Sequence, residues 1–212
     1  VAHNEQSLRV VDVLEKEGKG LNLTFEVRDG IVNHKKSGHP ATLEGKAVSL
    51  ADRIAYVNHD IEDAIRAGLL KEEDLPKRDI AVLGNSSRDR INTMITSIYE
   101  NSVDRNDVKM GEEEAKALED LRSFMFERVY ITEQSMKEEE RAKRMLSAMF
   151  DYFRKDKDKL PAFYLRLSEE YPLEQVISDY LSSMTDKFAV AVFNNIFIPK
   201  SWGLTEEDIE EL

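Results

Sequence analysis

Apolar side chains recur every three or four residues along most of the chain, which is the pattern of amphipathic helices. The clearest stripe consists of Leu50, Ile54, Val57, Ile61, Ala64 and Ile65. Thr42 lies before this stretch and Gly68 after it, and these residue types favour the start and the end of a helix. The pattern therefore predicts one long buried helix over residues 43–67.

Further helices are predicted where the same spacing lies between capping residues and helix breakers. The segments are residues 5–17, 24–33, 86–101, 112–128, 135–155 and 172–197, with Pro172 at the first helical position and a short acidic helix beginning at Thr205. Within residues 86–101 we expect the inward side chains to be Ile91, Met94, Ile95 and Ile98. No segment has convincing strand-like alternation and no internal repeat is visible, so the fold class is predicted to be all-α.

Composition restricts the class of protein further. The chain has 212 residues, 41% of them hydrophobic, and a net charge of −12, so it can fill a core but lacks the cationic surface that general nucleic-acid binding needs. It has no cysteine, which excludes disulfides and thiolate metal sites and favours a reducing cytoplasm. No apolar run reaches the roughly 18 residues of a membrane-spanning helix, so no membrane association is predicted.

One row of polar residues on the predicted long helix is a candidate functional site. Asp52, Tyr56 and Asp60 follow one another at spacings of four residues and share a face, with Arg53 beside them. Such a row offers a hard oxygen ligand for a cation, a phenol and a carboxylate for hydroxyl groups, and a guanidinium for phosphate. A solvated helix face has the same spacing, so the row alone leaves both interpretations open.

The remaining residues contain no recognisable catalytic motif of their own. The histidines are His3, His34, His39 and His59, and no two have the spacing of a helical metal site. No phosphate-binding glycine loop or nucleophile elbow is present. The charged run of residues 137–143 is predicted to be a solvated face, and Trp202 to be a packing residue. The residues alone therefore indicate an acidic all-α domain with one polar helix face.

A family resemblance narrows these possibilities. Residues 51–64, Ala-Asp-Arg-Ile-Ala-Tyr-Val-Asn-His-Asp-Ile-Glu-Asp-Ala, resemble the final conserved segment of the HD-domain deoxynucleoside triphosphate triphosphohydrolases, the dGTPase-like family. Three other stretches resemble the family in its own order, namely residues 3–9, 20–31 and 179–189. The resemblance implies an HD-domain-like helical bundle with a C-terminal helical extension. Residues 1–212 would form one all-α unit, with 1–103 as the remainder of the HD core and 104–212 as the C-terminal helical portion.

The resemblance implies roles for the polar row. Asp52 matches the family's last metal ligand, which implies a divalent ion such as Mg²⁺ or Mn²⁺, or another transition metal. Arg53 matches a position that contacts the triphosphate. Tyr56 and Asp60 match positions that contact the deoxyribose, chiefly its 3′-hydroxyl.

The resemblance also implies roles at the start of the chain. His3 matches a histidine proposed to transfer a proton near the scissile phosphate, which suits imidazole because it titrates near neutral pH. Asn4 and Gln6 would orient water or phosphate, although capping of the first helix explains them equally well.

The chain departs from the family pattern at the metal site. The family's other ligands, a histidine and a His-Asp doublet, normally precede the segment that matches residues 3–9, so only Asp52 of the four is present. We therefore expect a truncated protein or a partial sequence, the C-terminal portion of the enzyme. Because one carboxylate holds a catalytic ion poorly, we expect this chain alone to be inactive.

The expected activity of the full-length protein is hydrolysis of a dNTP, dGTP or another, to a deoxynucleoside and triphosphate. The alternatives are another HD-type phosphohydrolase acting on nucleoside monophosphates, cyclic nucleotides or alarmones, and a catalytically inactive helical regulatory or interaction module. The resemblance further implies a homo-oligomer, often a hexamer in this family.

Overall fold

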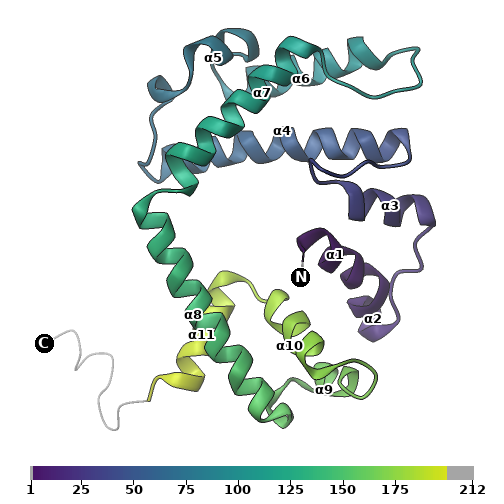
Figure 1. Ribbon diagram of the computed structural model, residues 1–212, viewed down its shortest axis with the longest axis vertical. Helices are drawn as coiled ribbons and strands as arrows, with labels where there is room; N and C mark the ends of the chain where they lie inside the picture. The colour runs from purple at the N-terminus through teal and green to yellow at the C-terminus, as the bar shows by residue number, and fades with distance from the viewer. Residues whose placement is uncertain (1, 200–212) are drawn as a thin grey trace, which may run out of the picture. The chain divides into compact units, whose positions relative to one another are not determined.

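The computed structural model describes residues 2–199, which form helices and connecting loops and contain no strand (Figure 1). The all-α prediction is confirmed. By internal contacts the chain separates into two compact units, residues 1–137 and residues 138–212. The predicted division between residues 103 and 104 falls inside the first unit and stays a prediction. Among the described residues, no helix is long and apolar enough to cross a membrane.

The long helix is α4, Leu43–Arg66, and it is continuous as predicted. Thr42 caps it by accepting a hydrogen bond from the Gly45 N–H at 3.0 Å, and Gly68 follows it with φ +72°. The buried stripe of α4 consists of Ile54, Val57, Ile61 and Ala64. This stripe belongs to the core of the first unit, so it fixes which face of α4 remains for the polar row.

Three further helices pack around that core, namely α5 (Lys77–Leu83), α6 (Ser87–Ser102) and α7 (Glu112–Met125), after a 3₁₀ turn at Glu72–Asp74. Ser86 caps α6 through the Asp89 N–H at 3.1 Å, as the predicted start requires. Met94 is fully buried and Ile91 and Ile98 pack against the core, but Ile95 is 56% exposed, so its predicted inward position is wrong. Successive helical residues are rotated by about 100°, and burial of Met94 turns Ile95 outward.

The predicted helix over residues 5–17 is interrupted. It consists of α1 (His3–Arg9), a π-helical turn (Val10–Leu14) and α2 (Glu15–Gly18), within which Lys16 and Glu17 have positive φ angles. Gly20 then turns the chain with φ +66°, where a Cβ would collide with the carbonyl group of Asp12. Helix α3, Phe25–Asn33, packs between α1 and α4.

The second unit contains most of α8 (Glu133–Lys155), a 3₁₀ turn (Lys157–Lys159), α9 (Ala162–Leu167), α10 (Leu173–Ser182) and α11 (Asp186–Phe197). The charged run on α8 is a solvated face, as predicted, because its residues are exposed and pair with neighbours three or four positions away.

The single helix predicted over residues 172–197 is wrong. Pro172 is the residue before α10 rather than its first helical residue, and the chain breaks after Ser182. Thr185 then starts α11 by accepting a hydrogen bond from the Phe188 N–H at 3.3 Å. This cap competes with helix continuation, which explains the break. Trp202 and the helix predicted from Thr205 lie outside the described residues.

Candidate functional site

A pocket of about 510 Å³ lies on the polar face of α4 in the first unit. Its walls come from the start of α1, the loop after α3, α4 and α7. It is lined by His3, His34, Lys35, Lys36, Asp52, Arg53, Tyr56, Val57, Leu118, Glu119 and Arg122. Four of the predicted site residues, His3, Asp52, Arg53 and Tyr56, are thus gathered in one pocket although 53 positions separate His3 from Tyr56.

The described part of the chain supplies only part of a metal site. Asp52 is exposed and lines a pocket that also contains His3 and His34, which are donor groups suited to a divalent ion. Within residues 2–199, however, no three His, Asp or Glu side chains are placed so that they could hold a metal together. These residues do not fit a complete metal centre, and Asp52 can contribute no more than one ligand.

Asp60 is the predicted residue that departs from the row. It does not line this pocket, and its half-buried carboxylate has one oxygen, Oδ2, buried with no hydrogen-bond partner among the described residues. Burial raises the pKa of Asp60, the charge of Asp63 raises it further, and His59 opposes the shift. Each step of four residues rotates a helical position by about 40°, so two steps carry Asp60 away from Asp52. Its sugar-binding role stays a prediction.

Asn4 and Gln6 also lie outside the pocket lining. Asn4 is buried and its Nδ2 donates a hydrogen bond to the Val32 carbonyl oxygen at 2.6 Å, which ties α1 to the end of α3. Gln6 is half-buried on α1. The structure gives Asn4 an architectural contact, and the substrate-binding roles of both residues stay predictions.

Four cations surround this pocket, Lys35, Lys36, Arg53 and Arg122. Glu119 accepts hydrogen bonds from Lys36 Nζ at 2.6 Å and from Arg122 at 3.5 Å. Burial alone would raise the pKa of Glu119, but the Lys36 hydrogen bond and the nearby cations outweigh burial and lower it. The carboxylate therefore stays ionised and pairs with Lys36 and Arg122, whose side chains are of the types that bind phosphate oxygens.

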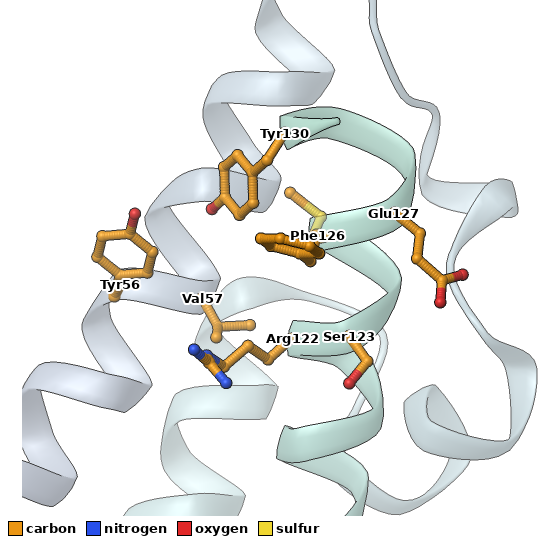
Figure 2. Close-up of a pocket in the computed structure, with 8 residues that line it drawn as sticks. Tyr56, Val57, Arg122, Ser123, Phe126, Glu127 and Tyr130 are labelled. Atoms are coloured by element: carbon orange, nitrogen blue, oxygen red, sulfur yellow. The ribbon is translucent and has the colours of Figure 1, made fainter. Parts of the chain in front are cut away.

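A second pocket, also of about 510 Å³, adjoins the first and shares Tyr56, Val57 and Arg122 with it. Its other lining residues are Ser123, Met125, Phe126, Glu127 and Tyr130. Figure 2 shows Tyr56 on α4 across from Phe126 and Tyr130, with Arg122 extended toward Val57. The rings of Phe126 and Tyr130 meet edge to face, with centroids 6.2 Å apart. One end of the combined site is therefore cationic and the other aromatic.

A π-helical turn, Phe126–Tyr130, ends α7 and presents the two rings. It is closed by the Ile131 N–H, which donates to the Phe126 carbonyl oxygen at 3.2 Å. Such turns insert a residue into a helix and often occur at functional sites. The sequence analysis did not assign these residues, although Arg122, Phe126 and Tyr130 repeat every four residues and form a detectable face.

Tyr56 lies where the two pockets meet and remains 57% exposed. Partial burial of its hydroxyl raises the pKa of Tyr56, the carboxylates of Asp60 and Asp52 add to this, and Arg122 opposes it. The phenol thus stays protonated near neutral pH and is able to donate a hydrogen bond.

Comparison with known proteins gives the family. Residues 108–195 match the phosphohydrolase-associated domain. The chain is 50% identical over 200 residues to a deoxyguanosinetriphosphate triphosphohydrolase-like protein of Caldanaerobacter subterraneus subsp. tengcongensis, covering 94% of this chain and 59% of that protein. It is 46% identical to the protein of the same name from Clostridium tetani, covering 93% and 60%, and 42% identical to one from Clostridium perfringens, covering 93% and 60%.

The structure combines an all-α fold with a cationic pocket beside an aromatic one. The matches are more specific, and they confirm the resemblance found in the sequence: the chain belongs to the dGTPase-like family of HD-domain phosphohydrolases. It spans about 60% of the length of these curated relatives.

Proposed function

We propose that the protein of which this chain is a part hydrolyses a deoxynucleoside triphosphate to a deoxynucleoside and triphosphate. The observation that carries the proposal is the adjacency of the two pockets, because a dNTP likewise joins an anionic chain to an aromatic base through a sugar. Each pocket, at about 510 Å³, is within the range of roughly 300–1,000 Å³ typical of small-molecule sites.

The cationic pocket would hold the triphosphate. Lys35, Lys36, Arg53 and Arg122 supply positive charge there, and guanidinium groups bind phosphate oxygens through paired hydrogen bonds. Tyr56, at the junction, would contact the sugar. Phe126 and Tyr130 would stack against the base, a contact that tolerates different bases because every base has a π face.

In the proposed reaction a water oxygen bonds to the α-phosphorus and the bond from phosphorus to the 5′-oxygen breaks. The water loses a proton and the departing 5′-oxygen gains one. His3, whose imidazole lines the pocket, would transfer such a proton. The cations would stabilise charge that accumulates on the phosphate oxygens in the transition state.

We further propose a divalent ion, Mg²⁺ or Mn²⁺, with Asp52 as one of its ligands. Such an ion supplies Lewis-acid catalysis when it is bound. Because Asp52 is the only family metal ligand matched here, we propose that the 212-residue chain by itself does not hydrolyse dNTPs.

The test compares this chain with a protein extended to the full length of its relatives. Each is incubated with single dNTPs and Mg²⁺ or Mn²⁺, and the products are separated by ion-exchange chromatography. The proposal expects triphosphate and deoxynucleoside from the longer protein. Release of pyrophosphate or monophosphate would instead favour another phosphohydrolase, and absence of any product would favour the inactive helical module.

A further inference from the structure

His34, to which the sequence analysis gave no role, lies beside His3 in the cationic pocket. It follows the last residue of α3, and its Nε2 is 3.3 Å from the Nε2 of His3. The rings meet edge to face, with centroids 5.2 Å apart and planes at 68°. At this separation the two nitrogens form a hydrogen bond, in which one is the N–H donor and the other is the acceptor.

The contacts of His34 decide which nitrogen donates. Its Nδ1 is 2.6 Å from the Ile31 carbonyl oxygen. A carbonyl oxygen only accepts, so Nδ1 of His34 carries hydrogen, and in the neutral ring Nε2 is left as an acceptor. The donor in the imidazole pair is therefore Nε2–H of His3. A neutral His3 with hydrogen on Nε2 has its lone pair on Nδ1.

The backbone of His34 is held against α4. Its backbone carbonyl oxygen accepts a hydrogen bond at 2.6 Å from Ser49 Oγ, a buried side chain on α4 three positions before Asp52. The Asn4–Val32 contact holds α1 against the same end of α3. These contacts join α1, α3 and α4 around the imidazole pair, and the contact of Nδ1 with the Ile31 carbonyl oxygen orients the ring of His34.

We propose that His34 is a positioning residue that holds His3 in the Nε2–H tautomer and so reserves Nδ1 of His3 as the atom that accepts a proton. The inference rests on the proposed function for the consequence in catalysis, because it assumes that His3 transfers a proton there. The tautomer itself is a property of this chain alone and is measured without substrate. Fixing the tautomer of a general base through a hydrogen bond to its other nitrogen is a common way of orienting imidazoles.

The first test is spectroscopic and uses the 212-residue chain labelled with ¹⁵N at histidine. Long-range ¹H–¹⁵N correlation spectra near pH 8 separate the two neutral tautomers. We expect His3 to be the Nε2–H form and His34 the Nδ1–H form. The proposal is overturned if His34 carries its hydrogen on Nε2, or if His3 is the Nδ1–H form.

Two variants separate positioning from simple packing. His34→Gln keeps a hydrogen-bond acceptor near the place of Nε2, whereas His34→Leu removes it. We expect His3 to keep its tautomer in the first variant and to become a mixture in the second. The matched controls are His39→Gln and His39→Leu, at an exposed histidine that does not line the pocket, and neither should alter the His3 signals.

The same variants in the extended protein test the catalytic consequence. We expect His34→Leu to lower kcat by about tenfold or more, with the 10²–10⁴-fold contribution typical of general acid–base groups as the upper bound, and with little change in KM. His34→Gln should recover most of that loss. Equal losses in both variants would overturn the catalytic role. An extended protein without hydrolase activity would overturn the proposed function, and the spectra would still decide the arrangement of the imidazoles.

Discussion

The orientation of α4 depends on a buried polar contact behind the site, and we expect its loss to destabilise the first unit. Asn58 is fully buried on α4, and its Nδ2 donates to the Ile54 carbonyl oxygen at 2.8 Å. Its Oδ1 accepts a hydrogen bond at 2.9 Å from Nε of Arg90, a side chain on α6 that is 3% exposed. Arg90 also donates to the Asn85 carbonyl oxygen at 3.1 Å. Burial lowers the pKa of Arg90, although nearby carboxylates oppose this.

The predicted perturbation is Asn58→Ala. It leaves a buried guanidinium N–H without an acceptor, which costs about 1–3 kcal/mol, and it opens a small cavity that adds about 1 kcal/mol. We therefore expect the free energy of unfolding to fall by about 2–4 kcal/mol. Since 1.4 kcal/mol is a factor of ten, the slowest amides should exchange roughly 30- to 700-fold faster.

Hydrogen exchange measured by mass spectrometry on peptides from α4 and α6 is the suitable assay, because it reports the first unit separately from the second. The matched control is Asn92→Ala, at an exposed asparagine of α6, where alanine should be neutral or slightly stabilising. If Asn58→Ala and Asn92→Ala changed exchange equally, the Asn58–Arg90 contact would not be holding α4 against α6.

Three further predictions concern the site. Asp60→Asn should raise the urea midpoint of unfolding at pH 7, because burial raises the pKa of Asp60 and its ionised form destabilises the fold. This gain in stability should shrink as the pH falls toward about 4, where the carboxyl group is protonated in the unfolded chain as well. A gain that does not depend on pH would contradict this cause. In the extended protein, Asp52→Ala should abolish metal-dependent triphosphate release through kcat, whereas Asp60→Ala should cost about 1–3 kcal/mol, mainly in KM; steady-state kinetics distinguish these outcomes. Tyr130→Leu should raise KM for dNTPs by a factor that corresponds to a loss of about 1–3 kcal/mol of binding free energy. The exposed control Tyr99→Leu should leave KM unchanged.

The sequence predicts the helices of this chain well where two signals agree. In α4 the apolar stripe, the Thr42 cap and Gly68 all indicate the same segment, and its predicted ends differ from the observed ones by a residue or less. Where the helix is interrupted inside a continuous apolar pattern, the prediction failed. Residues 172–197 continue the apolar spacing through a break that is set by the Thr185 cap, and residues 5–17 include a π-helical turn that spacing alone does not reveal.

The site was predictable only in part, for a physical reason. Periodicity finds residues that share one helix, such as Asp52 and Tyr56, and the family resemblance added His3 from another. Neither shows which separate helices face each other. Arg122 and Tyr130 reach the site because α7 packs against α4, and His34 does so because α3 ends beside α1. Spacing along one helix likewise does not show that the charged side chain of Arg90 is buried against α4.

The electrostatics of the cationic pocket explain how an acidic protein would accept a polyanion. The net charge of −12 disfavours approach of a triphosphate from a distance, but charges more than about 8–10 Å apart are screened at physiological salt. Close to the pocket, Lys36 and Arg122 are paired with Glu119, so their charge is partly balanced before any substrate binds. Binding of a triphosphate would then exchange one anionic partner for another. Because the cations are already held in place by Glu119, the exchange would need less ordering of long side chains than binding to free lysines and arginines.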